Sequence, residues 1–128
     1  MDRQGELKII RAAYARQILA AARIMGNARL EAALSATRRE DFLGAGPWWI
    51  LRWFRDYVTT PDADPVYLYT DDLVGILPER RLNNGQPSLH AHLIHQAHRL
   101  RAPTSCISEP VPPITPPGFR PCVSGLTS

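Results

Sequence analysis

Two adjacent carboxylates, Asp71 and Asp72, are the residues whose types most directly suggest chemistry. They follow residues 66–70, a segment rich in β-branched and aromatic residues that we expect to form a short strand. Two neighbouring carboxylates can act as general acid and base, or they can bind a cation. Because adjacent residues of an extended segment point to opposite faces, the spacing favours a turn-forming pair over a shared site.

Four histidines fall within a helix that we expect to run from Pro87 to about Leu100: His90, His92, His95 and His98. The last three recur at every third residue, which is close enough for two of them to share a metal ion. At about 100° per residue, four apolar residues form the stripe that we expect to be buried: Leu89, Leu93, Ala97 and Leu100. The three histidines lie on the opposite side and His90 flanks the stripe, so the sequence predicts a solvated polar face and no metal site.

Neither the glycines nor the cysteines form a recognisable site. Gly44-Ala45-Gly46 could belong to a glycine loop that binds phosphate, but a charged segment precedes it and Pro47 follows it, so we expect a simple turn. The two cysteines, Cys106 and Cys122, have no histidine-rich or Cys-x-x-Cys context. We expect no metal or redox role for them.

Hydrophobic periodicity predicts the helices that would position these residues. Apolar residues recur at helical spacing over residues 6–25, and Asn27 is placed to cap a second helix that ends near Ala36. The aromatic run at residues 48–57 predicts a further helix with its tryptophans in the core. Three aromatic side chains of that run share one helical face: Trp49, Trp53 and Tyr57.

The remaining segments predict two short strands and an irregular tail. Residues 66–70 and 73–77 have strand character, and Asn83-Asn84-Gly85 is a turn signal. From residue 101 the composition changes, and this tail holds seven of the 12 prolines. Such a segment cannot form a helix or a central strand, so we divide the chain into an ordered region, residues 1–100, and a tail, residues 101–128, that we expect to be disordered.

Length and charge narrow the classes of function. The 128 residues allow one domain, and the net charge of +3 comes from arginines dispersed among acids, so we expect no nucleic-acid binding. The longest apolar stretch, residues 18–25, contains Arg23 and is far shorter than the roughly 20 residues that a membrane span needs. We therefore expect no membrane insertion. Two cysteines near the end of the chain fit a cytoplasmic protein.

Three segments carry a resemblance to a known family: residues 30–42, Tyr69-Thr70-Asp71-Asp72, and Asn83-Asn84-Gly85-Gln86-Pro87-Ser88. Over roughly residues 6–100 the chain resembles the amino-terminal region of the protein-L-isoaspartate O-methyltransferases. The first segment is similar to the family's second helix and its Pro-Arg-Glu-x-Phe element, with Arg38 in place of the proline. The second is similar to the Tyr-x-Asp element, and the third stands where the family has Thr-Ile-Ser-Gln-Pro.

The resemblance implies roles for seven residues. Asp72 and Gly85 would take catalytic positions, Gly85 in place of the family's active-site serine. The substrate, a damaged protein or peptide, would be bound by a further five: Tyr69, Asn84, Gln86, Pro87 and Ser88. Because glycine lacks the hydroxyl of that serine, we expect the methyl acceptor to differ or no methyl group to be transferred. The cofactor of the intact family is S-adenosylmethionine.

The expected fold is mainly α with a short β element (α+β), as the amino-terminal helical extension of a Rossmann-like α/β methyltransferase, followed by the tail. The family's next element is a strand that ends in a glycine-rich loop, and it does not follow residue 100. We therefore expect a truncated or frameshifted fragment that binds no S-adenosylmethionine and is inactive alone. Without the domain it packs on, its exposed apolar surface predicts self-association.

A second class of function stays open. The chain could be a non-catalytic helical protein-interaction module. In that case the tryptophan-rich segment and Pro110-Val111-Pro112-Pro113 would bind a partner, because proline-rich segments adopt an extended helix that docks on aromatic grooves. Composition alone supports this alternative only through the prolines and the tryptophans.

Overall fold

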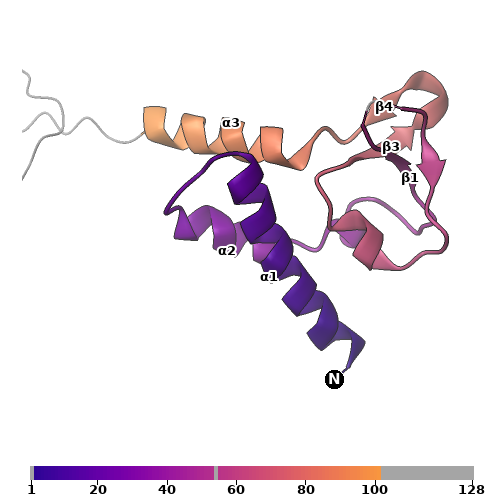
Figure 1. Ribbon diagram of the computed structural model, residues 1–128, viewed down its shortest axis with the longest axis horizontal. Coiled ribbons are helices and arrows are strands. Elements are labelled where there is room, and N and C mark those ends of the chain that lie inside the picture. Colours follow the sequence, from indigo (N-terminus) through magenta and orange to yellow (C-terminus); the bar gives the residue numbers. More distant parts are fainter. Residues whose placement is uncertain (1, 54, 102–128) are drawn as a thin grey trace, which may run out of the picture.

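The described residues, 2–53 and 55–101, fold into three α-helices and a small antiparallel sheet in this computed structural model (Figure 1). The helices are α1 (Arg3–Ala21), α2 (Ala28–Ala36) and α3 (Pro87–Leu100). The strands are β1 (Trp49–Leu51), β2 (Val58–Thr59), β3 (Leu73–Leu77) and β4 (Leu82–Asn83). Short 3-10 helices connect them: η1 (Arg39–Asp41), η2 (Pro65–Leu68) and η3 (Pro78–Arg80). The α+β class is therefore confirmed, whereas the predicted tail beyond residue 101, with both cysteines, lies outside the described residues.

Local backbone conformation and capping set the bounds of the first two helices. Asn27 Oδ1 accepts a hydrogen bond from the Leu30 N–H at 3.0 Å, which confirms the predicted cap of α2. α1 ends at Ala21 and not near residue 25, because Arg23 takes the left-handed conformation at φ 55°. Among the described residues, no helix is both long enough and apolar enough to cross a membrane.

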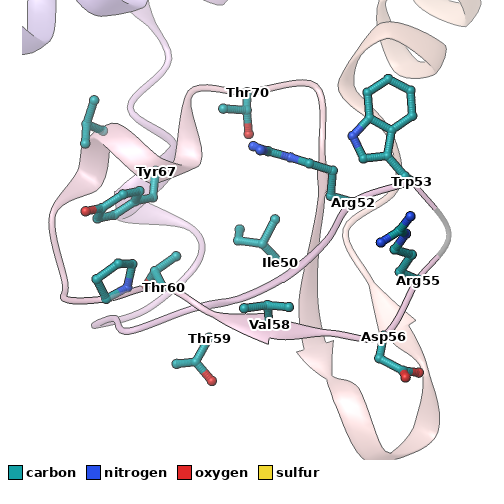
Figure 2. A pocket seen from close by; sticks show the side chains of 12 residues that line it. Ile50, Arg52, Trp53, Arg55, Asp56, Val58, Thr59, Thr60, Tyr67 and Thr70 are labelled. Atoms are coloured by element: carbon teal, nitrogen blue, oxygen red, sulfur yellow. The ribbon is translucent and has the colours of Figure 1, made fainter.

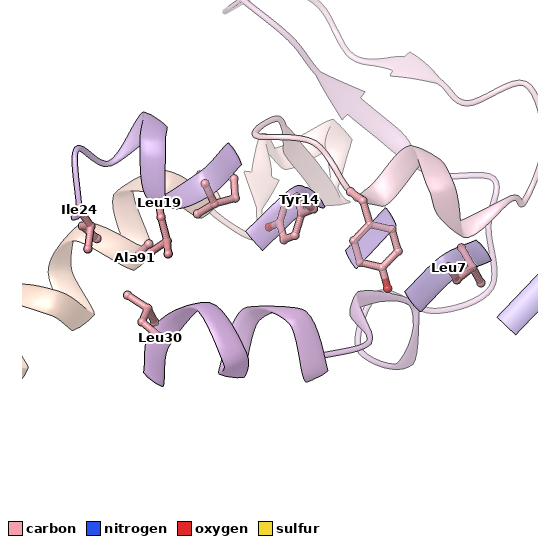
Figure 3. Packing of buried hydrophobic residues seen from close by; sticks show 8 residues of the cluster. Leu7, Tyr14, Leu19, Ile24, Leu30 and Ala91 are labelled. Carbon is pink, nitrogen blue, oxygen red and sulfur yellow. The ribbon is translucent and has the colours of Figure 1, made fainter. Parts of the chain in front are cut away.

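The helices pack around an apolar cluster to which α1 contributes most (Figure 3). Its buried members are Leu7, Tyr14, Ile18, Leu19, Ile24, Leu30, Tyr69 and Ala91. A second, smaller cluster lies at the sheet and contains Trp48, Leu68 and Val74. Leu68 and Tyr69 are adjacent in the chain but belong to different clusters. The end of η2 is therefore the point where the helical part and the sheet are joined.

The tryptophan-rich segment forms strands and a turn, so the helix predicted for residues 48–57 is wrong. β1 pairs with β2 on one side and with β3 on the other, in the order β2-β1-β3-β4. The Thr60 N–H donates to the Trp48 carbonyl at 2.8 Å, and the Trp48 N–H donates to Thr60 Oγ1 at 3.0 Å. Because side chains alternate along an extended backbone, Trp48 is buried whereas Trp49 is exposed. Trp53, in the turn after β1, is also exposed, so the predicted core packing holds for Trp48 alone.

The strand predicted for residues 66–70 is also wrong, because most of that segment lies in η2. Pro65 occupies the first position of this 3-10 helix, and Asp64 Oδ1 accepts a hydrogen bond from the Val66 N–H at 3.0 Å. This cap outweighs the strand propensity of the β-branched and aromatic residues. The strand predicted for residues 73–77 is confirmed as β3, which pairs with β1 and β4.

α3 has the predicted bounds, but it presents a different face to the rest of the molecule. The stripe predicted to be buried is exposed: Leu89, Leu93, Ala97 and Leu100. The helix docks through Ala91, which is 1% exposed, and through His95, whose Nδ1 lies 2.9 Å from Asn27 Nδ2. Both the buried stripe and the solvated position of His95 are therefore wrong, because the small side chain of Ala91 lets α3 approach α1 closely.

Asn27 makes two contacts that hold α2 and α3 in place, and substitution can separate them. Asn27→Ala removes the cap and the contact with His95, so we expect the free energy of unfolding to fall by about 1–3 kcal/mol. Asn27→Asp keeps an oxygen that accepts from Leu30 and loses the amide that reaches His95, so we expect a smaller loss. Urea denaturation measures both variants, and equal losses would contradict a major role for the cap.

Candidate functional site

Two of the motif segments meet at the start of α3. The Asp71 carboxylate accepts hydrogen bonds from the Ser88 N–H at 2.8 Å and from Nε2 of Gln86 at 3.2 Å. The N–H groups in the first turn of a helix have no partner within the helix, and the helix dipole favours a negative charge at that end. Asp71 therefore stabilises the start of α3 and ties it to the segment between η2 and β3.

Asp72, to which the resemblance assigns a catalytic position, points to a different partner. Its Oδ2 accepts from Nε of Arg52 at 3.0 Å and from Nη2 at 2.7 Å. These hydrogen bonds raise the pKa of Arg52 above its ordinary value. The two adjacent carboxylates thus bind separate groups, as the spacing predicts. It is Asp71, and not Asp72, that contacts the segment containing Gln86 and Ser88.

Tyr69 is buried, and its hydroxyl donates a hydrogen bond to the Glu40 carboxylate. Two guanidinium groups lie beside that carboxylate: Nη1 of Arg11 is 3.8 Å and Nε of Arg38 is 3.3 Å from Oε1. Burial, together with the hydrogen bond to Glu40, raises the pKa of Tyr69. Burial alone would raise the pKa of Glu40, but the hydrogen bonds from Tyr69 and Arg38 hold that pKa below its ordinary value. Tyr69 therefore has a structural partner in place of the substrate contact that the resemblance implies.

Arg39 supports the same segment from the helical side. Its Nη1 donates to the Tyr14 hydroxyl at 2.6 Å and lies 3.3 Å from the Thr70 carbonyl. The guanidinium also stands 5.4 Å from the centre of the Tyr14 ring, within range of a cation–π contact. Burial raises the pKa of Tyr14, although the charge of Arg39 opposes this rise. Arg39 thus holds the backbone that carries Asp71 against α1.

The segment before α3 is held by its own side chains. Asn84 Oδ1 accepts from the Val74 N–H at 2.9 Å, and Asn83 Oδ1 accepts from the Gly85 N–H at 3.0 Å. Pro87 is buried in the first turn of α3. Gly85 has φ 77°, in the left-handed region that favours glycine. Asn84, Gly85 and Pro87 therefore shape the backbone that places Gln86 and Ser88 beside Asp71.

A hollow with a volume of about 890 Å³ opens beside the same segment (Figure 2). We call it the β1–β2 hollow, because Ile50 of β1 and Val58 of β2 line it together with Thr70. Figure 2 shows Tyr67 on one side and Trp53 on the other. Most of the surface that lines it is apolar, so it can hold an apolar group. Since Thr70 and Asp71 are adjacent, the hollow and the start of α3 share one stretch of backbone.

Comparisons of the chain with protein-family models, with curated proteins and with solved structures give no match. Within residues 2–53 and 55–101, no group of three histidine, cysteine, aspartate or glutamate side chains is placed to hold a metal ion. Sequence reasoning did not select Tyr14, Arg39 or Glu40 as site residues. The signal for Arg39 and Glu40 is the charged run after α2, residues 38–41, but this run does not reveal that Arg39 is buried.

The hydrogen bond between Tyr69 and Glu40 makes stability depend on pH. Because the pKa of Glu40 is lowered in the folded protein, its stabilising effect is present above the ordinary value of 4.5 and is lost as the pH falls through the lowered pKa. Tyr69→Phe removes one cause of that lowering. We expect it to reduce the free energy of unfolding by about 1.5–3 kcal/mol at neutral pH, since one partner is charged.

The difference between wild type and Tyr69→Phe should narrow as the pH falls below 4.5. Urea denaturation at a series of pH values measures it, and Tyr57→Phe, which removes a hydroxyl remote from Glu40, is the matched control. A difference that stays constant from neutral to acid pH would contradict the contribution of Glu40.

A glycine is required at position 85 for two reasons: its φ is positive, and the His90 side chain leaves no room for a Cβ. A Cβ at this position would lie 2.4 Å from Nε2 of His90. Gly85→Ala should therefore lower the free energy of unfolding by about 1–2 kcal/mol from the backbone conformation, with the contact adding to it. The double variant with His90→Ala removes the contact and keeps the strained backbone, so we expect partial recovery. His90→Ala alone is the control, and a double variant no more stable than Gly85→Ala would contradict the contact.

Proposed function

We propose that this chain is the amino-terminal, substrate-binding part of an S-adenosylmethionine-dependent protein carboxyl methyltransferase related to the protein-L-isoaspartate O-methyltransferases, acting in the cytoplasm. The observation that carries the proposal is the contact of Asp71 with Gln86 and Ser88. Residues of two separate motif segments meet there, at the start of α3. The resemblance pairs these segments at one substrate site, and the contact is consistent with that pairing.

The polar groups around the start of α3 suit a carboxyl-bearing substrate. Gln86 is exposed, and its side-chain amide and the Ser88 side chain can donate hydrogen bonds to a carboxyl oxygen. Asp71 positions both residues. In this proposal Asn84 and Pro87 shape the segment, and Gly85 stands where the family has a serine, with His90 in the place of a side chain. Asp72 remains the proposed catalytic carboxylate, and its hydrogen bonds from Arg52 fix its position.

The described residues do not fit S-adenosylmethionine. The cofactor cradle of a Rossmann-like domain is a glycine-rich turn between a parallel strand and a helix. Every pairing in the described sheet is antiparallel, and the glycine turn at Gly44 precedes Pro47 and a strand instead of a helix. In the proposal, a separate Rossmann-like domain would bind the cofactor and act together with this substrate-binding part.

A second candidate function is a protein-interaction module, and one observation favours it. The apolar stripe of α3 is exposed, with Leu93 at 55% and Leu100 at 87%. Exposed apolar faces of this kind are typical of interaction surfaces. The stripe would also support the predicted self-association. The two candidates differ in what they recognise. The methyltransferase part requires a carboxyl group at the start of α3, whereas the interaction module requires an apolar partner on the exposed stripe of α3.

Peptide binding separates these candidates. We expect the full chain to bind a fluorescent peptide that contains an isoaspartyl residue at least about fivefold more tightly than the same peptide with ordinary aspartate, measured by fluorescence anisotropy. Gln86→Ala should abolish the preference, because it removes a hydrogen-bond donor to the carboxyl group, which the isoaspartyl linkage places differently from ordinary aspartate. Arg16→Ala, an exposed α1 variant, is the control. Equal affinity for both peptides, or methyl transfer by the purified chain alone, would contradict the proposal.

A further inference from the structure

We propose that the β1–β2 hollow is a binding site for a small aromatic carboxylate, separate from the substrate site proposed above at the start of α3. Its volume of about 890 Å³ lies within the range of roughly 300–1,000 Å³ that is typical of small-molecule sites. Two features of the lining select this class of ligand. One is an apolar floor between two aromatic side chains, and the other is a pair of guanidinium groups, that of Arg52 near Thr70 and that of Arg55 near Trp53 (Figure 2).

The floor of the hollow continues the apolar cluster of the sheet. Ile50 and Val58 are direct partners in the pairing of β1 with β2, so their side chains lie on the same face. Ile50 also packs against the cluster of Trp48, Leu68 and Val74. The floor thus runs from this buried cluster, through Ile50, to Val58, which is 67% exposed. An apolar ring placed on this floor would remove these side chains from water, which favours binding.

Arg52 is held in place for a carboxylate. Asp72 accepts from its Nε and Nη2, which fixes the guanidinium plane. Figure 2 shows the same group reaching across the hollow toward Thr70. Nη1 is not used by Asp72 and can donate to a ligand oxygen. Because Asp72 already orders the long side chain, a ligand loses less free energy in ordering it.

Arg55 provides a second guanidinium group, on the side of the hollow where Trp53 lies (Figure 2). No carboxylate among the described residues lies within ion-pair distance of Arg55. Asp56 also lines the hollow and Asp72 pairs with Arg52, so two guanidinium groups and two carboxylates lie at its walls. Arg55 can therefore form a charge-assisted hydrogen bond to a ligand anion, because its own charge is not taken up by an ion pair among the described residues. Together with the apolar floor it favours an anion with an apolar body.

Trp53 forms an aromatic wall of the hollow, and its backbone is strained. Its φ is 56°, a conformation that a bulky residue rarely adopts, and its side chain is 83% exposed. Strained residues of this kind cluster at ligand sites. Neither the strain nor the exposure stabilises the free protein. A ring stacked on the indole would cover this exposed surface, so the indole is placed for ligand binding and not for folding.

Calorimetric titration of the full chain with 3-phenylpropionate tests the site. We expect 3-phenylpropionamide, which has the same body without the charge, to bind at least about tenfold more weakly, and acetate, which has the charge without the body, to give no heat of binding. Arg55→Ala should weaken binding of the acid by at least about fivefold and leave the affinity for the amide unchanged. Arg16→Ala, which removes an exposed arginine far from the hollow, should change neither affinity.

A second variant, Trp53→Gly, separates a loss of binding from a loss of folding. Glycine relieves the backbone strain, so this variant should unfold at a higher urea concentration than Trp53→Ala and yet bind 3-phenylpropionate more weakly than wild type. Equal affinity of wild type for the acid and the amide would overturn the proposal, as would unchanged affinity in Arg55→Ala or the absence of any heat with the acid. A peptide ending in phenylalanine that binds more tightly than the free acid would overturn it in favour of a peptide site.

Discussion

The buried guanidinium of Arg39 is the group on which the arrangement of the molecule depends. It is 9% exposed, and a buried charge without partners would cost several kcal/mol. Its partners come from two distant parts of the chain, the Tyr14 hydroxyl on α1 and the Thr70 carbonyl ahead of β3. The helical part and the sheet must therefore approach each other in one orientation. Glu40 and Tyr69 add a second polar contact at the same junction.

This junction links both candidate sites to one short segment between η2 and β3. Tyr69 packs in the helical cluster, Thr70 lines the β1–β2 hollow, Asp71 caps α3, and Asp72 orders Arg52. Neighbouring residues thus serve four different parts of the molecule. A change that frees the Thr70 carbonyl would disturb the start of α3 and the hollow together. Loss of function after substitution of Arg39 would for this reason be a positioning effect at either site.

The sequence predicted what local chemistry decides and missed what distant pairing decides. The Asn27 cap, the proline in the first turn of α3 and the strand character of residues 73–77 are visible in side chains within a few residues of each other. The helix predicted at residues 48–57 is wrong, because the aromatic spacing suits a helix and the pairing of Trp48 with Thr60 is not visible in the local pattern. The site is similar: motif spacing selected the right segments, but only the fold shows which carboxylate contacts Ser88.

The orientation of α3 shows why periodicity alone is not sufficient. Its apolar stripe is the expected buried face of an amphipathic helix, yet the helix buries Ala91 and brings His95 to Asn27. Asp71 binds the first turn and so fixes where the helix starts, and close approach to α1 requires a small residue at the contact. These constraints leave the Leu89 and Leu93 side of the helix in solvent. Contact of this stripe with water costs free energy in the isolated chain, because of the hydrophobic effect. Both proposed functions supply a second body to cover it: a cofactor domain in the methyltransferase, or a binding partner in the interaction module.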